Sequence, residues 1–221
     1  PFNITPDPRF LFLTGRHREA LEHLLYGIRQ RKGFICLTGE VGTGKTTLCR
    51  TLLGRLGPRF HTALILNPVL TQTQMLRAIV DEFGIVSKRL DRLGYLNLLN
   101  RFLLQVNGNG RDAVLIIDEA QDMSTQGLEM VRLLSNLETE RQKLLQIVLV
   151  GQPELRRKLA KPNLRQLAQR ITVRYHLGQM DRDETEGYLE HRLEVAQGDA
   201  EGPAVRFDAG AVHEIYRFSR G

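Results

Sequence analysis

A glycine-rich segment in the first quarter of the chain has the residue types and spacing of a phosphate-binding loop. Residues 39–46 fit the pattern G-x-x-x-x-G-K-T. Glycines allow a tight turn whose backbone N–H groups point at phosphate oxygens, and the dipole of the following helix strengthens that field. We expect Lys45 to bridge the β- and γ-phosphates of a nucleoside triphosphate, and the Thr46 hydroxyl to bind Mg²⁺. The residues expected to contact the triphosphate are Glu40, Val41, Gly42, Thr43, Gly44, Lys45, Thr46 and Thr47.

Two adjacent acids, Asp118 and Glu119, follow the apolar segment 113–117. In a parallel sheet, the carboxyl ends of the strands present ligand-binding groups at one edge. Asp118 would then reach Mg²⁺ through water or help to orient Thr46. Glu119 would accept a proton from an attacking water molecule or polarise it. The pair therefore predicts hydrolysis of the bound triphosphate, and the alternative is a strand end with two solvated acids.

A polar residue, Gln152, comes directly after a second apolar segment at 145–150 and one glycine. If that segment is a central strand, its end lies between the two acids and the phosphate-binding loop. The side chain of Gln152 could then donate a hydrogen bond to the attacking water molecule or to the γ-phosphate. The alternative is a turn residue in front of Pro153.

The rest of the chain supplies the elements that position these residues. Short apolar segments alternate with helical patterns, which predicts a three-layer αβα fold with a central five-stranded parallel sheet and helices on both faces. The predicted strands are 34–38, 61–66, 113–117, 145–150 and 171–177, and the helical patterns between them are 45–56, 72–83, 96–106, 127–137 and 155–159. After Gly178 only helical patterns follow, at 181–195 and 207–218. We therefore expect a core domain, 1–178, and the beginning of a small helical domain, 179–221.

The composition indicates an ordinary globular protein but does not by itself indicate a function. Apolar residues make up 42% of the chain and charged residues 25%, as in ordinary globular proteins. No apolar segment approaches the roughly 18 residues of a membrane helix, so we expect no membrane span. The two cysteines are too few for a metal cluster or a disulfide framework. The formal net charge is +6, and a basic tract without an acid extends over residues 156–174.

These motifs together resemble the AAA+ ATPases, which have the P-loop NTPase fold, and more narrowly the ExeA-like group, general secretion pathway protein A. The resemblance covers essentially the whole chain. It rests on the segments 1–8 (PFNITPDP), 17–21 (HREAL), 39–47 (GEVGTGKTT), 118–121 (DEAQ), 151–155 (GQPEL) and 169–171 (QRI). It implies ATP as the nucleotide, with Mg²⁺, and a trailing helical lid.

The resemblance also assigns roles to residues outside the loop. Gln152 matches the polar sensor on the fourth strand, where many relatives have Asn. Arg170 matches the arginine finger that reaches the γ-phosphate of a neighbouring subunit, with Arg165 as the next candidate and a solvated arginine as the alternative. The segment 2–17 is expected to lie near the adenine. A lid arginine in a Gly-x-Pro-Arg pattern is expected beyond Gly221, so the chain resembles a fragment with a truncated lid that hydrolyses ATP slowly.

Expected partners also come from the resemblance. Proteins of the ExeA-like group work with an inner-membrane partner protein to place the secretin of a type II secretion system. The chain would then self-associate into a ring or dimer and form the cytoplasmic domain of an inner-membrane protein. Its membrane span would lie outside residues 1–221.

Two alternatives stay open. The net charge and the basic tract would also suit a DNA-binding ATPase that resembles the transposition regulators, although no helix-turn-helix or zinc module is evident. The truncated lid would suit a nucleotide-gated scaffold with negligible hydrolysis.

Overall fold

The central feature of the fold is a parallel five-stranded sheet in the order β2-β3-β4-β1-β5. The computed structural model describes residues 10–139, 142–198 and 205–219. The strands are β1 (Phe34–Gly39), β2 (Phe60–Ile65), β3 (Asp112–Ile117), β4 (Leu145–Gly151) and β5 (Ile171–Leu177). All five predicted strands are confirmed, within two residues at each end.

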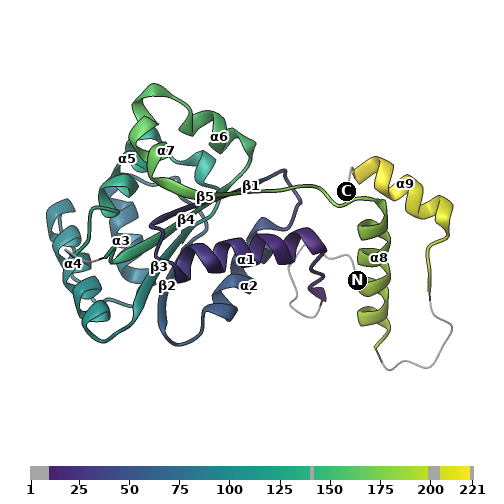
Figure 1. Ribbon diagram of the computed structural model, residues 1–221, viewed down its shortest axis with the longest axis horizontal. Helices are drawn as coiled ribbons and strands as arrows, with labels where there is room; N and C mark the ends of the chain where they lie inside the picture. The colour runs from purple at the N-terminus through teal and green to yellow at the C-terminus, as the bar shows by residue number, and fades with distance from the viewer. Residues whose placement is uncertain (1–9, 140–141, 199–204, 220–221) are drawn as a thin grey trace.

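Helices cover both faces of the sheet, as Figure 1 shows. They are α1 (Gly15–Arg29), α2 (Lys45–Leu56), α3 (Gln72–Glu82), α4 (Arg92–Gly108), α5 (Thr125–Leu134), α6 (Pro153–Leu159) and α7 (Arg165–Arg170), with short 3₁₀ turns η2 (Ala120–Asp122) and η3 (Pro162–Leu164). The first two pack on one face and the others on the opposite face, because alternate strand residues enter two separate apolar clusters. In β3, for example, Val114 and Ile116 join α1 and α2, whereas Leu115 and Ile117 join the other side. The predicted three-layer α/β fold is confirmed.

The boundaries of α4 and α5 differ from the sequence prediction by three or more residues at one end. Helix α4 begins at Arg92, because the Asp91 side chain caps it by accepting a hydrogen bond from the Gly94 amide. The sequence NGNG at 107–110 predicts a turn, but the helix continues through Gly108, so the turn is confined to residues 109–110. Helix α5 ends at Leu134, three residues earlier than predicted.

Two further helices, α8 (Arg182–Gln197) and α9 (Ala209–Ser219), lie beside the sheet layers at the right of Figure 1. An aspartate, Asp181, caps α8 in a reciprocal capping box with Glu184. The guanidinium of Arg16 connects the start of α1 to this region, since it donates to the Gln179 carbonyl and lies 3.3 Å from a carboxylate oxygen of Asp181. Within the described residues, no helix is long and apolar enough to cross a membrane. The sequence predicts an extended segment at 1–8, from its three prolines, and a loop at 197–203. The first segment, most of that loop and the last two residues lie outside the described part of the chain.

Candidate nucleotide-binding site

The phosphate-binding loop connects β1 to α2, as its motif requires. Gly44 caps the helix with a φ of 79°, and Gly42 has a φ of 84°. Both angles lie in the left-handed region that side chains disfavour, so these two turns require glycine. Thr43 closes the loop, because its hydroxyl donates to the Glu40 carbonyl at 2.9 Å. The amides at the start of α2 therefore come together as an anion-binding end.

Lys45, the first residue of α2, is buried with its ammonium group inside the loop. Its Nζ donates to the Glu40 carbonyl at 2.7 Å. Burial lowers the pKa of Lys45, and the nearby negative charges of Glu119 and Asp118 oppose that effect. A partly desolvated cation held by one neutral carbonyl is well suited to bind phosphate oxygens.

Thr46, the second residue of α2, meets Asp118, which directly follows β3. The Thr46 hydroxyl donates to Oδ2 of Asp118 at 2.6 Å, and Asp118 is almost fully buried. A hydroxyl and a carboxylate are hard oxygen ligands, and Mg²⁺ is commonly held by one or two such groups together with substrate phosphates and water. Among the described residues, no group of three or more His, Cys, Asp or Glu is placed so that it could hold a metal ion. The donor set thus fits Mg²⁺ bound together with a phosphate ligand.

Glu119 lies beside this pair and is held by two side-chain amides. Its Oε2 accepts from Nε2 of Gln121 at 2.7 Å and from Nε2 of Gln152 at 3.5 Å. Gln152 directly follows β4, which lies between β1 and β3 in the sheet. The structure therefore brings Lys45, Thr46, the two acids and Gln152 to one edge of the sheet.

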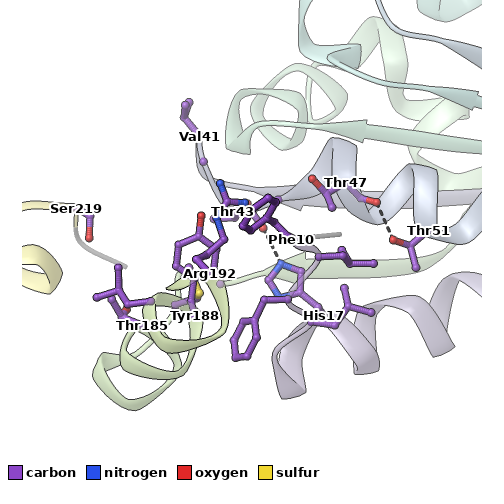
Figure 2. Close-up of a pocket in the computed structure, with 18 of the residues that line it drawn as sticks. Phe10, His17, Val41, Thr43, Thr47, Thr51, Thr185, Tyr188, Arg192 and Ser219 are labelled. Atoms are coloured by element: carbon purple, nitrogen blue, oxygen red, sulfur yellow. Dashed lines mark hydrogen bonds between the residues drawn. The ribbon is translucent and has the colours of Figure 1, made fainter. Parts of the chain in front are cut away.

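A cavity of about 710 Å³ opens next to the loop, and residues from several parts of the chain line it (Figure 2). They come from the segment 10–13, from α1, from loop residues 41–44, from α2, from residues 178 and 180, and from α8 and α9, including Tyr188 and Arg192. The guanidinium of Arg192 lies over the Phe10 ring, 4.7 Å from its centroid. Phe12 meets Tyr188 edge to face at 6.2 Å. An apolar cavity beside a phosphate-binding loop has the size and lining for a nucleoside.

His17 connects the cavity wall to the loop. Its Nε2 lies 2.9 Å from the Thr43 carbonyl, and its Nδ1 lies 2.8 Å from the Thr14 hydroxyl. A carbonyl only accepts, so Nε2 must bear a proton, and in the neutral imidazole the Thr14 hydroxyl then donates to Nδ1. Burial lowers the pKa of His17 and favours this neutral tautomer, although the Thr43 carbonyl and Glu184 act in the opposite direction.

Arg170 lies elsewhere. It ends α7, directly before β5, and the first residue of β5, Ile171, pairs with the first residue of β1, Phe34. Its guanidinium donates to the Ser135 hydroxyl at 2.6 Å and to the Asn136 side chain at 2.5 Å. Arg170 is therefore at the sheet edge opposite the phosphate-binding loop of its own chain. Any contact with a γ-phosphate would have to be made on another subunit.

Among the residues of the site that were assigned no individual role from the sequence are His17 and Gln121. Both occur in segments that carry the family resemblance, HREAL and DEAQ, which was the only available signal. Their partners lie 26 and 31 residues away along the chain, so pattern analysis could not pair them.

The chain is similar to proteins of known sequence and structure. A model of an AAA domain family, AAA_22, matches residues 28–159. General secretion pathway protein A of Aeromonas hydrophila is 49% identical over 197 residues, which is 89% of this chain and 36% of that protein. The chain therefore spans about a third of that relative's length.

Solved structures share the fold at lower identity. The Aeropyrum pernix ORC2 protein, in ADPNP and ADP complexes, has a TM-score of 0.59 and 18% identity, over 86% of this chain and 56% of that one. The Aeropyrum pernix ORC1 protein in complex with DNA has a TM-score of 0.65 and 19% identity, over 86% and 52%. The strand order, the phosphate-binding loop and the matched residues lead to one conclusion: this chain belongs to the AAA domain family AAA_22, as an ExeA-like member.

Proposed function

We propose that this chain binds ATP with Mg²⁺ and hydrolyses it by attack of water on the γ-phosphate. The observation that carries the proposal is the 2.6 Å contact between Thr46 and Asp118, with Lys45 and Glu119 at the same sheet edge. A loop that only bound an anion would not need two acids beside it. Relatives with nucleotide bound, such as the ORC2 protein, support a nucleotide as the ligand.

Each side chain then has a defined task. Lys45 exchanges its bond with the Glu40 carbonyl for phosphate oxygens. Thr46 and Asp118 would hold Mg²⁺, which supplies neutralisation of the phosphate charge when bound. Glu119 accepts a proton from the attacking water molecule or polarises that molecule. Gln152 orients either the Glu119 carboxylate, whose Oε2 lies 3.5 Å from its Nε2, or the water molecule itself.

The cavity supports a division of the chain into two parts. We assign residues 1–178 to the nucleotide-binding core and 179–221 to a helical lid, because α8 contributes one wall of the cavity while the loop contributes the other. The nucleoside would lie between them, against the segment that includes Phe10 and Phe12. Closure of α8 over the ligand would exclude water from the phosphates.

Replacement of Glu119 by Gln tests this function. We expect ATP affinity to stay within about threefold while turnover falls by about 10²-fold or more, since general-base catalysis contributes 10²–10⁴-fold. The matched control is Glu22→Gln on the exposed surface of α1, which should change neither quantity. Unchanged turnover in Glu119→Gln removes its catalytic role. A wild-type chain that binds ATP without any turnover would instead indicate the nucleotide-gated scaffold.

The position of Arg170 supports a site completed by a neighbour, in a ring or dimer. A mixing experiment separates this from a structural role. Arg170→Ala retains the nucleotide site, and Lys45→Ala retains the finger, so their mixture should regain turnover that neither variant has alone. The control mixture pairs Arg170→Ala with the Lys45→Ala/Arg170→Ala double variant and should stay inactive. Equal activity of the two mixtures would exclude Arg170 as a trans-acting finger.

In the cell, we assign the chain to envelope assembly, as an ATPase that works with an inner-membrane partner of a type II secretion system from the cytoplasmic side. The support is the 49% identity to general secretion pathway protein A. Co-purification with an inner-membrane protein, and loss of secretin assembly in a strain that carries Lys45→Ala, test this role. Normal secretin assembly in that strain would remove it.

DNA binding is a second candidate, favoured by the similarity to the ORC1 protein in complex with DNA and by the basic tract. Part of the tract is already used within the chain, however. Lys158 donates to two carbonyls, Arg170 to the end of α5, and Arg174 to the Ala168 carbonyl. ATP-dependent DNA binding that weakens steeply with salt would support this function. Lack of binding at low salt would end it.

A further inference from the structure

The side-chain amide of Gln121 has both of its ends engaged at the strand edge. Gln121 is the middle residue of η2, directly after the two acids, and it is buried. Its Nε2 donates to Oε2 of Glu119 at 2.7 Å, and its Oε1 accepts from the backbone N–H of Gln152 at 3.0 Å. One amide thus connects the acid that follows β3 to the end of β4.

The end of β4 is shaped to admit this amide. A Cβ atom at Gly151 would lie 2.6 Å from Oε1 of Gln121, closer than real Cβ contacts come. The φ of Gly151 is not in the left-handed region, so backbone freedom is not the reason for glycine here. The lack of a side chain at Gly151 leaves room for the Gln121 amide against the strand.

The backbone of Glu119 has a strained conformation that contacts from neighbouring residues must maintain. Its φ is 49°, a left-handed conformation that is strained for a residue with a Cβ. Such a conformation persists where surrounding contacts determine it. The bond from Gln121 is the shorter of the two side-chain amide bonds to this carboxylate. Both amides meet the same oxygen, Oε2, so within the described residues Oε1 is left for a water molecule.

A lysine fixes the backbone that carries the amide. Nζ of Lys158, on α6, donates to the Gln121 carbonyl and, at 2.7 Å, to the Met123 carbonyl. Helix α6 begins directly after Gln152, so the same short segment contacts η2 at both of its ends. The 3₁₀ turn therefore cannot shift away from β4 without the loss of these bonds.

We propose that Gln121 is the positioning residue for Glu119. It holds the carboxylate at a fixed distance from the end of β4, so that Oε1 is presented to the attacking water molecule. This inference deepens the proposed function and depends on Glu119 acting on that water. Gln121 itself need not touch the nucleotide or the water. Its effect on turnover should pass entirely through Glu119.

A double-mutant cycle tests the inference on this chain. Gln121→Met keeps the length and apolar part of the side chain but removes its hydrogen bonds with Glu119 and Gln152, and a longer one from Nε2 to Oδ2 of Asp122 at 3.3 Å. We expect turnover at saturating ATP to fall about 10- to 100-fold, as for the misplacement of a reacting group by about 1 Å, with ATP affinity within about twofold. In a Glu119→Gln background, where the carboxylate is already lost, Gln121→Met should change turnover less than twofold. The matched control, Gln126→Met at an exposed position, should behave as wild type.

The outcomes separate the inference from the proposed function. If the wild type hydrolyses ATP and Gln121→Met hydrolyses it at the same rate, the inference is overturned and the proposed function stands. An equal loss in both backgrounds also overturns it, because a general structural role would act without Glu119. A chain without any turnover overturns the hydrolysis proposal, and then the NMR signal of the Gln121 side-chain amide decides. That signal should shift and exchange faster in Glu119→Ala, and an unchanged signal would exclude the contact.

Discussion

Replacement of Lys45 by Met separates the contribution of its ammonium group to stability without nucleotide from its contribution to ATP binding. The variant keeps the aliphatic stem and removes the ammonium group. In the absence of nucleotide, Nζ makes one bond, to the Glu40 carbonyl at 2.7 Å, in a buried position that lowers its pKa. That carbonyl also accepts from the Thr43 hydroxyl at 2.9 Å, so the variant leaves no carbonyl without a donor. We therefore expect the free energy of unfolding without nucleotide to change by less than about 1 kcal/mol.

The effect on ATP binding should be much larger. Two hydrogen bonds from a charged donor to phosphate oxygens contribute about 1.5–3 kcal/mol each, or about 3–6 kcal/mol together. ATP affinity should then fall about 10²- to 10⁴-fold. At an ATP concentration 100 times the wild-type Kd, binding stabilises the wild type by about 2.7 kcal/mol but stabilises a 100-fold weaker variant by only about 0.4 kcal/mol.

Thermal unfolding with and without ATP and Mg²⁺ measures both effects at once. For a chain of this size, about 1 kcal/mol corresponds to about 2–4 °C, so ATP should raise the wild-type Tm by about 5–11 °C and that of Lys45→Met by about 1 °C. Lys88→Met, at an exposed lysine, should match the wild type. Titration calorimetry gives the affinities directly. A Lys45→Met variant that binds ATP within tenfold of wild type would refute the reasoning, and a large loss of Tm without nucleotide would refute the small contribution assigned to its contact with the Glu40 carbonyl.

The remaining predictions address other parts of the site. Thr46→Val should abolish the increase in ATP affinity caused by Mg²⁺, measured by titration with and without the metal, while binding without Mg²⁺ stays within about threefold because backbone amides still hold the phosphates. Gly151→Ala should destabilise the chain by about 1–3 kcal/mol and slow turnover, since its Cβ would lie 2.6 Å from Oε1 of Gln121, whereas Gly54→Ala, in open space on α2, should be neutral or stabilising by up to about 1 kcal/mol in denaturant unfolding. Burial lowers the pKa of His17 in the folded chain below its ordinary value of 6.5. Below about pH 6.5, His17 therefore binds more protons in the unfolded chain than in the folded chain. The stability from His17 is therefore complete above about pH 6.5 and is lost as the pH falls through the folded-state pKa, with a slope of at most about 1.4 kcal/mol per pH unit, and His17→Gln should remove this part of the pH dependence in unfolding titrations at pH 5 and pH 7.5. An unchanged slope in that variant would show that another group causes it.

Local patterns predicted most of the framework that holds the phosphates. The strand, the glycine turn and the helix from Phe34 to Leu56 are consecutive in the chain, and each depends on neighbours a few residues away. The meeting of Thr46 with Asp118 could also be expected, since the carboxyl ends of parallel strands share one edge. The position of Gln152 needed one more assumption, that its strand is central, which the order β3-β4-β1 confirms.

Helix ends were harder to predict where two signals compete. Gly108 and the asparagines beside it indicate a turn, yet α4 continues through this glycine before the chain turns into β3. Packing of buried residues such as Leu103 and Val106 against the core outweighs the weak helix propensity of Gly108. Propensity alone could therefore not locate this boundary.

By itself, the sequence determined the fold class, the phosphate-binding loop and the acids that accompany it, because these depend on periodicity and on motifs contiguous in the chain. Only the tertiary structure decided which side chains hold the loop and the acids in place. The contact of His17 with the Thr43 carbonyl and the bridge from Gln121 to Gln152 join segments that are distant in sequence. Such contacts depend on strand order and on angstrom-level fit, such as the space that Gly151 leaves open, and no periodic pattern encodes that fit.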